Sequence, residues 1–145
     1  MRAAIEPRIL ILCPLAREWS FLVRTFEASL HAERLDDLKI DAAYIPDWRV
    51  LVAPGGHGKT QFAVQAQYVI SRFSSAEVVI CAGAAGSLAP ELSVGDVVVG
   101  TETVQHDYRQ LFATRPLPRF PATGRRLTLC VARRKELVAS RLPLM

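Results

Sequence analysis

Three short apolar runs alternate with two amphipathic segments in the first part of the chain, and this order most constrains the fold. The runs lie at 8–15, 48–54 and 77–83. Between them, apolar side chains recur at helical spacing from Leu15 to Leu30 and from Phe62 to Phe73. Because the runs are continuous rather than alternating, we expect strands covered on both faces. The β-α-β-α-β order predicts a parallel sheet with helical crossovers.

The remaining segments are less regular. Residues 31–47 are polar, and we expect a loop that carries a short edge strand. Residues 95–107 predict one long strand or two in succession, and residues 115–121 predict a loop rich in proline and arginine. Apolar spacing predicts a last helix over 124–142. No repeat or low-complexity linker divides the chain, so we expect one domain.

The composition is typical of a globular chain with a buried core, since 50% of the 145 residues are apolar and 22% are charged. No apolar run approaches the roughly 20 residues of a membrane span, so we expect no membrane contact and a cytoplasmic location. A secretory signal is disfavoured because Glu6 and Arg8 precede a short apolar run. The cysteines, which share no metal-like spacing, are expected to be small core residues: Cys13, Cys81 and Cys130.

Basic residues gather in the last part of the chain. Residues 109–145 hold 9 of the 18 Lys and Arg residues and 1 of the 14 Asp and Glu residues. Such a segment can indicate an anionic partner, including nucleic acid. No aromatic residues interleave for base stacking and no nucleic-acid-binding motif occurs. We therefore favour a solvated helix and loop and expect no nucleic-acid partner.

Ligands of parallel sheets bind beyond the carboxyl ends of the strands, and three stretches of this chain are predicted to lie there. They are 15–18, 55–59 and 83–87. Gly83 and Gly86 in the last stretch would let the backbone approach a flat ligand such as a purine. Pure turn chemistry is the alternative interpretation for both glycines.

The segment "VAPGGHGKTQF" (52–62) fits a relaxed phosphate-loop pattern, with a predicted strand before it and a helix after it. Ala53 stands where the strong form of the motif has glycine. The run 77–83 ends in Cys-Ala-Gly, so it provides no carboxylate for Mg²⁺. A nucleoside triphosphatase is therefore disfavoured, and Lys59 is interpreted as a residue of the first helical turn.

The stretch "AGAAGSLAPELSVGDVVVG" (82–100) carries the most specific pattern, a Gly-x-Ala-Gly-x-Leu turn followed by Val-Gly-Asp-Val-Val-Val. It resembles the nucleoside phosphorylase/nucleosidase superfamily, most closely its methylthioadenosine/S-adenosylhomocysteine nucleosidase branch. "PLAREWSFL" (14–22) resembles the family's exit from the first strand, "GGHGK" (55–59) its Gly-x-Gly-Lys turn, and "QHD" (105–107) its aromatic-His-Asp segment. The resemblance implies an α/β fold, three-layer αβα, with a mixed, largely parallel sheet of the purine nucleoside phosphorylase type, incomplete at the C-terminus.

The resemblance implies an N-ribosyl hydrolase that cleaves the glycosidic bond of a purine nucleoside such as methylthioadenosine or S-adenosylhomocysteine, as in methionine salvage. It implies that Glu18 is catalytic, holding and deprotonating the attacking water. An ordinary first-turn glutamate, favoured by the helix dipole, is the alternative. Substrate binding is implied for His57, on the 5′ side, and for Ala84, Ala85 and Gly86. Asp96 is expected to pair within the turn that precedes its strand, and no cofactor or metal is expected.

The nucleophile could be water or phosphate. Phosphorylases of this family hold phosphate with arginine and serine near the exit of the third strand, where this chain has Cys81 and Ala84. Hydrolysis is therefore favoured over phosphorolysis. Ala84 also departs from the serine of many methylthioadenosine nucleosidases, and Gln105 replaces an aromatic residue, so futalosine hydrolysis stays open.

Two segments that the resemblance implies are absent from the 145 residues: a Met-Glu-x-Glu stretch for the ribose and a Ser-Asp pair for the leaving purine. Residues 1–145 are therefore expected to form a single, truncated nucleoside phosphorylase-like domain. Two functions are carried forward. One is a nucleosidase that lacks part of its active site here, with a homo-oligomeric, dimeric assembly expected. The other is an inactive remnant that binds a nucleoside or a partner subunit.

Overall fold

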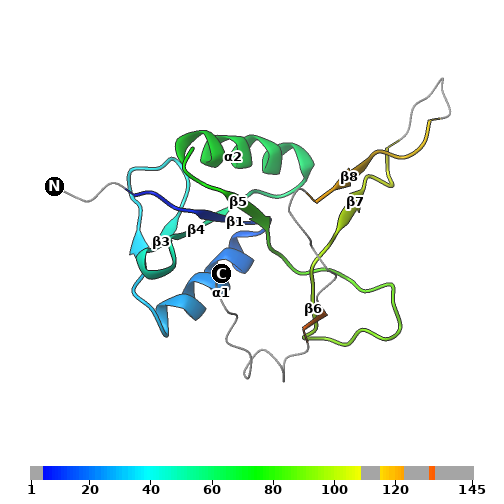
Figure 1. Ribbon diagram of the computed structural model, residues 1–145, viewed down its shortest axis with the longest axis horizontal. Coiled ribbons are helices and arrows are strands. Elements are labelled where there is room, and N and C mark those ends of the chain that lie inside the picture. Colours follow the sequence, from blue (N-terminus) through cyan, green and yellow to red (C-terminus); the bar gives the residue numbers. More distant parts are fainter. Residues whose placement is uncertain (1–4, 109–114, 123–130, 133–145) are drawn as a thin grey trace. The chain divides into compact units, whose positions relative to one another are not determined.

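A five-stranded mixed sheet organises Met1–Ala85, the first of two compact units; the second is Gly86–Met145. The computed structural model describes residues 5–108, 115–122 and 131–132. The elements of the first unit follow in chain order (Figure 1): β1 (Ile9–Cys13), α1 (Ala16–Glu27), β2 (Glu33–Arg34), β3 (Ala43–Ile45), the 3-10 helix η1 (Pro46–Trp48), β4 (Val50–Pro54), α2 (Lys59–Arg72) and β5 (Val78–Cys81).

The strand order is β2-β3-β4-β1-β5, with β1 parallel to both of its neighbours. Ile9 lies opposite Val50 on one side and Val78 on the other. β3 is antiparallel to β4, and β2 is antiparallel to β3. The predicted β-α-β-α-β order is therefore confirmed, and the edge strand expected within 31–47 is a pair of short strands.

The two helices cover opposite faces of this sheet (Figure 1). On the α1 face, Trp19 and Val23 are buried in one apolar cluster, and the Trp19 Nε1–H donates to the Val52 carbonyl at 3.1 Å. On the α2 face, Val69 and Phe73 are buried in the other cluster. Helix, sheet and helix thus form three layers, as the α/β class predicted from the sequence requires.

Strand β5 was predicted to be covered on both faces, but it is exposed. Val78, Val79 and Ile80 are 42–47% exposed, and Cys81 is also exposed. β5 is the edge strand of the sheet described here, so it has one hydrogen-bonded neighbour, and no described residue of it is buried. Cys13 is buried as expected, whereas the expectation of a core residue was wrong for Cys81.

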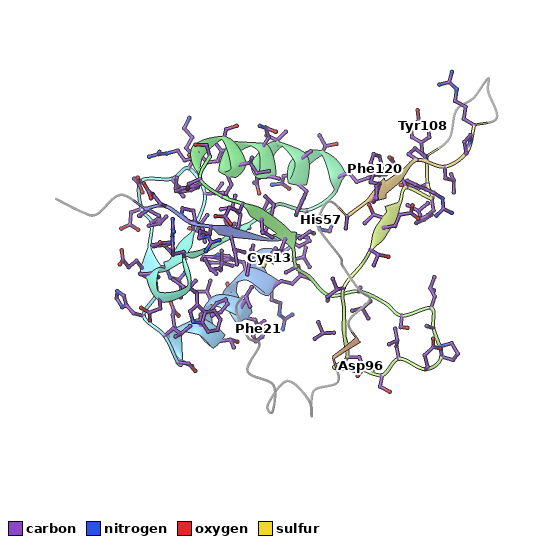
Figure 2. The ribbon with its side chains drawn as sticks, in the orientation of Figure 1. Cys13, Phe21, His57, Asp96, Tyr108 and Phe120 are labelled. Atoms are coloured by element: carbon purple, nitrogen blue, oxygen red, sulfur yellow. The ribbon has the colours of Figure 1, made fainter. Side chains whose placement is uncertain are left out.

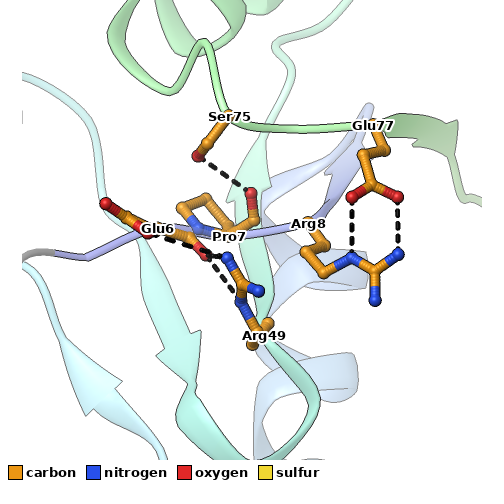
Figure 3. A network of polar contacts seen from close by, with 6 residues as sticks. All are labelled: Glu6, Pro7, Arg8, Arg49, Ser75 and Glu77. Atoms are coloured by element: carbon orange, nitrogen blue, oxygen red, sulfur yellow. Dashed lines mark hydrogen bonds and ion pairs between the residues drawn. The ribbon is translucent and has the colours of Figure 1, made fainter.

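A polar network joins the amino ends of β1, β4 and β5 (Figure 3). Arg8 donates to both carboxylate oxygens of Glu77 at 2.8 and 2.7 Å, and Ser75 Oγ donates to the Pro7 carbonyl at 3.2 Å. The Arg49 guanidinium donates twice to the Glu6 carbonyl at 3.1 and 3.0 Å. These contacts tie the strands together at the end opposite the predicted ligand rim.

The second unit contains four short strands among its described residues: β6 (Val97–Val98), β7 (Glu102–Val104), β8 (Arg119–Pro121) and β9 (Val131–Ala132). β6 pairs with β9 and β7 with β8, both antiparallel. The segment 95–107 therefore holds two strands in succession. The predicted loop 115–121 is wrong over its last three residues, because ladder hydrogen bonds to β7 make them a strand.

The predicted helix 124–142 meets the described residues only at Val131–Ala132, which form a strand rather than a helix. The other residues of that prediction, Cys130 included, lie outside the described residues. Asp96 does pair within its turn, because its Oδ2 accepts the Ser93 N–H at 2.9 Å. Gly95, just before it, has a φ of 101°, which explains why glycine stands there. None of the helices described is long and apolar enough to cross a membrane.

Candidate functional site

Glu18 lies in the first turn of α1, directly after the exit of β1. Its Oε2 accepts the Leu15 N–H at 2.9 Å, which satisfies an amide at the helix start as in half of a capping box. Its Oε1 accepts the Ala84 N–H at 2.7 Å, beyond the exit of β5. The carboxylate is only partly buried. A carboxylate has about four acceptor positions, so two hydrogen bonds orient it and leave capacity for a water or hydroxyl.

Gly83 is in close contact with this carboxylate. A Cβ on Gly83 would lie 3.1 Å from each Glu18 carboxylate oxygen and 3.1 Å from Pro14 Cδ. Those distances are too short for ordinary carbon contacts, so the absence of a side chain lets the backbone of β5's exit approach Glu18. Gly83 therefore makes room for the Glu18 carboxylate, and its approach to a ligand stays a prediction.

Two thiols lie within electrostatic reach of Glu18. The pKa of Cys13 is raised to about 11, mainly by burial and further by the charge of Glu18 and by Cys81. The pKa of Cys81 is also raised, first by burial and then by the charge of Glu18. Both groups are therefore neutral thiols at neutral pH. Among the described residues, no group of three or more His, Cys, Asp or Glu side chains could hold a metal ion.

Two glycines shape the turn between β4 and α2. Gly56 and Gly58 have φ values of 90° and 81°, which favour glycine at both positions. The His57 N–H donates to Gln61 Oε1 at 3.1 Å, so the turn is closed by a residue of α2. The strand-turn-helix context read from the sequence is correct, and α2 begins at Lys59 as expected.

A cavity of about 630 Å³ lies beside the exits of β1 and β4. Its walls come from the segment 14–16, the loop 35–41, Gly56 and His57 of the turn after β4, and Gln61 and Gln65 on α2. Figure 2 labels His57. Glu18 is not among the lining residues. Leu15 lies between the cavity and the carboxylate, because it lines the cavity and its N–H donates to Glu18 Oε2.

The site residues predicted from the sequence are placed as follows. Glu18 and Ala84 are joined by a hydrogen bond, and Ala85 follows as an exposed residue of the same unit. His57 is exposed and lines the cavity. Gly86 belongs to the second unit, and a Cβ added to it would meet no described atom within 4 Å.

Sequence reasoning missed the loop 35–41 as a wall of the cavity. Its sequence "LDDLKID" alternates apolar and charged residues, and Leu35 is buried while Asp36, Lys39 and Asp41 are exposed. That alternation was a usable signal, since apolar anchors on the sheet leave the intervening charges facing outward.

Known proteins resemble this chain in sequence and in fold. The family model of the phosphorylase superfamily matches residues 8–140. The 5'-methylthioadenosine/S-adenosylhomocysteine nucleosidase of Mycobacterium bovis is 30% identical over 111 residues, which are 77% of this chain and 43% of the relative. The structure of the Neisseria meningitidis nucleosidase of the same name, in complex with methylthio-immucillin-A, has a TM-score of 0.59 at 28% identity and covers 81% of this chain and 53% of that one.

Futalosine hydrolase of Helicobacter pylori has a TM-score of 0.60 at 23% identity, over 79% of this chain and 50% of that one, which is a likeness of fold. The chain thus spans about half, or less, of the length of the relatives it matches. The family match nevertheless covers both rim segments that meet at Glu18 and the turn that carries His57. The resemblance found in the sequence is confirmed, and the chain belongs to the phosphorylase superfamily.

Proposed function

We propose that this chain carries the water-positioning part of a nucleosidase site, which hydrolyses the N-glycosidic bond of a purine nucleoside such as methylthioadenosine or S-adenosylhomocysteine. One observation carries the proposal: backbone amides from the exits of β1 and β5 hold the Glu18 carboxylate on the ligand rim. A side chain fixed from two segments keeps its orientation while it accepts a proton, which is what a general base requires.

The chemistry assigned to Glu18 is proton abstraction from water. The water oxygen would form a bond to the anomeric carbon of the ribose while the bond from that carbon to the purine nitrogen breaks. The bonding pair leaves with the base, the carboxylate takes one proton of the water, and the base must gain a proton from a separate acid. Of these two proton transfers, Glu18 accepts the proton that the water loses.

Water is favoured over phosphate as the nucleophile. The Ala84 N–H, which could otherwise donate to an oxyanion, donates to Glu18 instead. The resemblance implies a cation in phosphorylases where this chain has Cys81, and a cysteine side chain has no positively charged form. A phosphate dianion beside the Glu18 carboxylate would meet a like charge, which disfavours phosphate there.

The test is base release by the purified 145-residue chain with methylthioadenosine, S-adenosylhomocysteine and futalosine as substrates. Replacing a general base should lower turnover by about 10²- to 10⁴-fold, so Glu18→Gln should abolish measurable release. Glu27→Gln is the matched control, because Glu27 ends the same helix and pairs with Arg34 at 2.8 Å. Equal turnover by the wild-type protein and Glu18→Gln would sink the assignment.

Nucleoside binding without hydrolysis is the second candidate. It is supported by the geometry at Glu18, because a carboxylate held by the Leu15 and Ala84 amides could accept a hydrogen bond from a nucleoside hydroxyl without any hydrolysis. Calorimetric titration with methylthioadenosine separates the two candidates. Binding that Glu18→Gln leaves unchanged, together with no base release by the wild-type chain, selects the binding function.

A further inference from the structure

We infer that strand β5 is a self-association surface, through which two copies of this chain join their sheets edge to edge in an antiparallel arrangement. The partner is a second copy of the chain, and it is bound by main-chain hydrogen bonds and by the apolar side chains of Val78–Cys81. The inference does not rest on the proposed function, because it requires neither a nucleoside nor Glu18.

The two edges of the five-stranded sheet differ in how they are protected from pairing. β2, at one edge, has two residues, Glu33 and Arg34, and the Arg34 guanidinium lies 2.8 Å from Glu27. Short and charged edge strands are a common protection against association. β5 lies at the other edge of the sheet that the structure describes, and its sequence VVIC contains no charged residue, proline or glycine. Only the β5 edge is therefore open to another strand.

The side chains of β5 are apolar and exposed on both faces of the sheet. Val78, Val79 and Ile80 are 42–47% exposed. Val79 lies opposite Leu10, which belongs to the apolar cluster on the α2 face. Ile80 lies opposite Ile11, which packs against the cluster on the α1 face. A strand added beside β5 would therefore remove apolar surface from water on both faces.

The hydrogen bonds of β5 determine which of its main-chain groups are directed outward. The N–H groups of Val78 and Ala82 donate to carbonyls of the segment 8–12, at 3.1 and 3.0 Å. In a strand, the N–H and C=O of one residue point to one side and those of the next residue point to the other. The main-chain groups of Val79 and Cys81 therefore point away from β1. Each of these two residues presents one donor and one acceptor at the edge.

One register pairs all of these groups. An antiparallel pair about a two-fold axis at Ile80 places Val79 opposite the partner's Cys81, and the two residues exchange both hydrogen bonds. The symmetry repeats this exchange between Cys81 and the partner's Val79. Ile80 then faces the partner's Ile80 as a non-hydrogen-bonded pair, with the Cα atoms about 4.5 Å apart. Each cross-strand pair is apolar, and such pairs stabilise a sheet.

Charge favours a second copy as the occupant of this edge. Glu77, the charged residue that precedes β5, accepts from Arg8 with both carboxylate oxygens, at 2.8 and 2.7 Å, so its charge is balanced within its own copy. Two β5 strands therefore meet without like charges between them. Because each copy has one unprotected edge, the two-fold pair is closed and forms a dimer rather than a fibre.

The size of the surface sets the expected affinity. A stable interface buries about 800 Å² on each partner, which is more than one strand of four residues supplies. We therefore expect a weak dimer, with a dissociation constant of about 10–100 µM. Sedimentation equilibrium of the purified chain from about 1 µM to about 1 mM measures it, and the average mass should rise from that of one chain toward that of two.

Val79→Pro tests the hydrogen bonds at the edge. Proline removes an N–H that points to the partner and leaves the ladder with β1 intact, which is the position where a strand tolerates it. The symmetry removes two hydrogen bonds, so we expect association to weaken at least about tenfold. Val79→Thr is the matched control, because it keeps the N–H and a β-branched side chain, and its association should stay within about twofold of the wild type.

Ile80→Lys tests the two-fold axis and decides the matter if Val79→Pro does not fold. The substitution places two lysine side chains opposite each other across the axis, where like charges destabilise the pair. Because Ile80 is 42% exposed, circular dichroism should show an unchanged fold while association is lost. Val64→Lys is the control, since Val64 is 66% exposed on α2, and it should associate as the wild type does.

Cross-linking tests the register. In a background of Cys81→Ser and Cys130→Ser, Ile80→Cys should form a disulfide-linked dimer with oxidised glutathione, because about 4.5 Å between Cα atoms suits a disulfide. Val64→Cys in the same background should do so at least about tenfold more slowly. The inference is overturned if the wild type stays a monomer up to about 1 mM, if folded Val79→Pro or Ile80→Lys associates as the wild type does, or if both cysteine variants cross-link equally fast.

Discussion

Among single residues, Gly83 makes the contact on which the position of Glu18 depends. A methyl group on Gly83 would lie 3.1 Å from both Glu18 oxygens and from Pro14 Cδ, so Gly83→Ala must displace the carboxylate or the turn. Overpacking of this kind costs about 1–3 kcal/mol. We expect an unfolding free energy lower by about 1 kcal/mol and a nucleoside affinity lower by at least about tenfold, since 1.4 kcal/mol is tenfold in binding.

Urea unfolding and calorimetric titration check the Gly83→Ala prediction. Gly100→Ala is the control, because a Cβ there would meet only the Glu102 carbonyl oxygen, at 4.0 Å. If Gly83→Ala bound nucleoside as tightly as Gly100→Ala, the contact between Gly83 and Glu18 would have no bearing on the site.

The thiol of Cys81 provides a second probe of the Glu18 carboxylate. The negative charge of Glu18 contributes to the raised pKa of Cys81, after burial. Glu18→Gln removes that charge, so the pKa should fall and the thiolate fraction at a fixed pH below it should rise. Because the thiolate is the nucleophile, iodoacetamide should modify Cys81 about twofold faster or more at pH 8.

Peptide mass spectrometry resolves the modification of Cys81 from that of the other cysteines. Asp47→Asn is the control, because Asp47 lies in η1 at the opposite end of the strands. Alkylation that is equally fast in the wild-type protein and in Glu18→Gln would place the carboxylate too far away to act on the thiol.

The positions of side chains at this site could be predicted from the sequence better than the hydrogen bonds made by its backbone groups. The position of the Glu18 carboxylate at the strand exits could be predicted because Glu18 follows a buried strand and starts a helix, while its catalytic role stays a prediction. The donor on the other side, the Ala84 N–H, left no trace in the sequence, since every residue except proline carries that group. The cavity wall at Asp36, Lys39 and Asp41 was missed because the alternation of apolar and charged residues in this loop indicates which side chains face outward, but not that they enclose a space.

At the scale of elements, the packing of α1 on the sheet depends on one buried hydrogen bond. Trp19 is 8% exposed, and its Nε1–H donates to the Val52 carbonyl of β4. Trp19→Phe removes the donor and part of the ring, so the unfolding free energy should fall by about 2 kcal/mol. Urea unfolding followed by circular dichroism measures the change.

Trp48→Phe is the matched control for α1, since Trp48 is 56% exposed and has only an edge contact with Phe26 at 5.7 Å between ring centroids. Its effect should stay within about 0.5 kcal/mol, as for most surface substitutions. Equal destabilisation by the two variants would contradict the role assigned to the Trp19 hydrogen bond.

The elements that the sequence predicted well are those with a strong period. α1 and α2 each have apolar side chains at helical spacing, and β1 and β4 are short apolar runs that contribute buried residues to both apolar clusters. β5 has the same apolar signature, yet it lies at the edge and is exposed. The local pattern of apolar residues indicates which side chains can be buried. Whether they are buried depends on which strands and helices pack beside them, and the local pattern does not identify those neighbours. For the same reason β8, a short strand paired at long range, was taken for a loop.

At the scale of the whole molecule, burial is concentrated in the first unit. Among the residues whose burial the structure describes, every buried one lies between Pro7 and Phe73, and none in 86–108 or 115–122 is buried. Amide hydrogens are protected from exchange when opening them requires exposure of packed apolar side chains. The two units should therefore differ sharply in local stability, although both contain hydrogen-bonded strands.

Hydrogen exchange followed by mass spectrometry tests this difference. Peptides that cover β1 and β4 should exchange slowest, because these strands are hydrogen-bonded on both sides and lie beneath both helices. Peptides that cover β6 and β7 should exchange at least about tenfold faster, since a difference of 1.4 kcal/mol in opening free energy already gives that factor. β5 is the internal control: it belongs to the first unit but is exposed, so its rate should lie between the two. Equal protection of β7 and β1 would contradict the predicted difference between the units. A β5 that exchanges as slowly as β1 would show that exposure of the edge strand does not lower its protection.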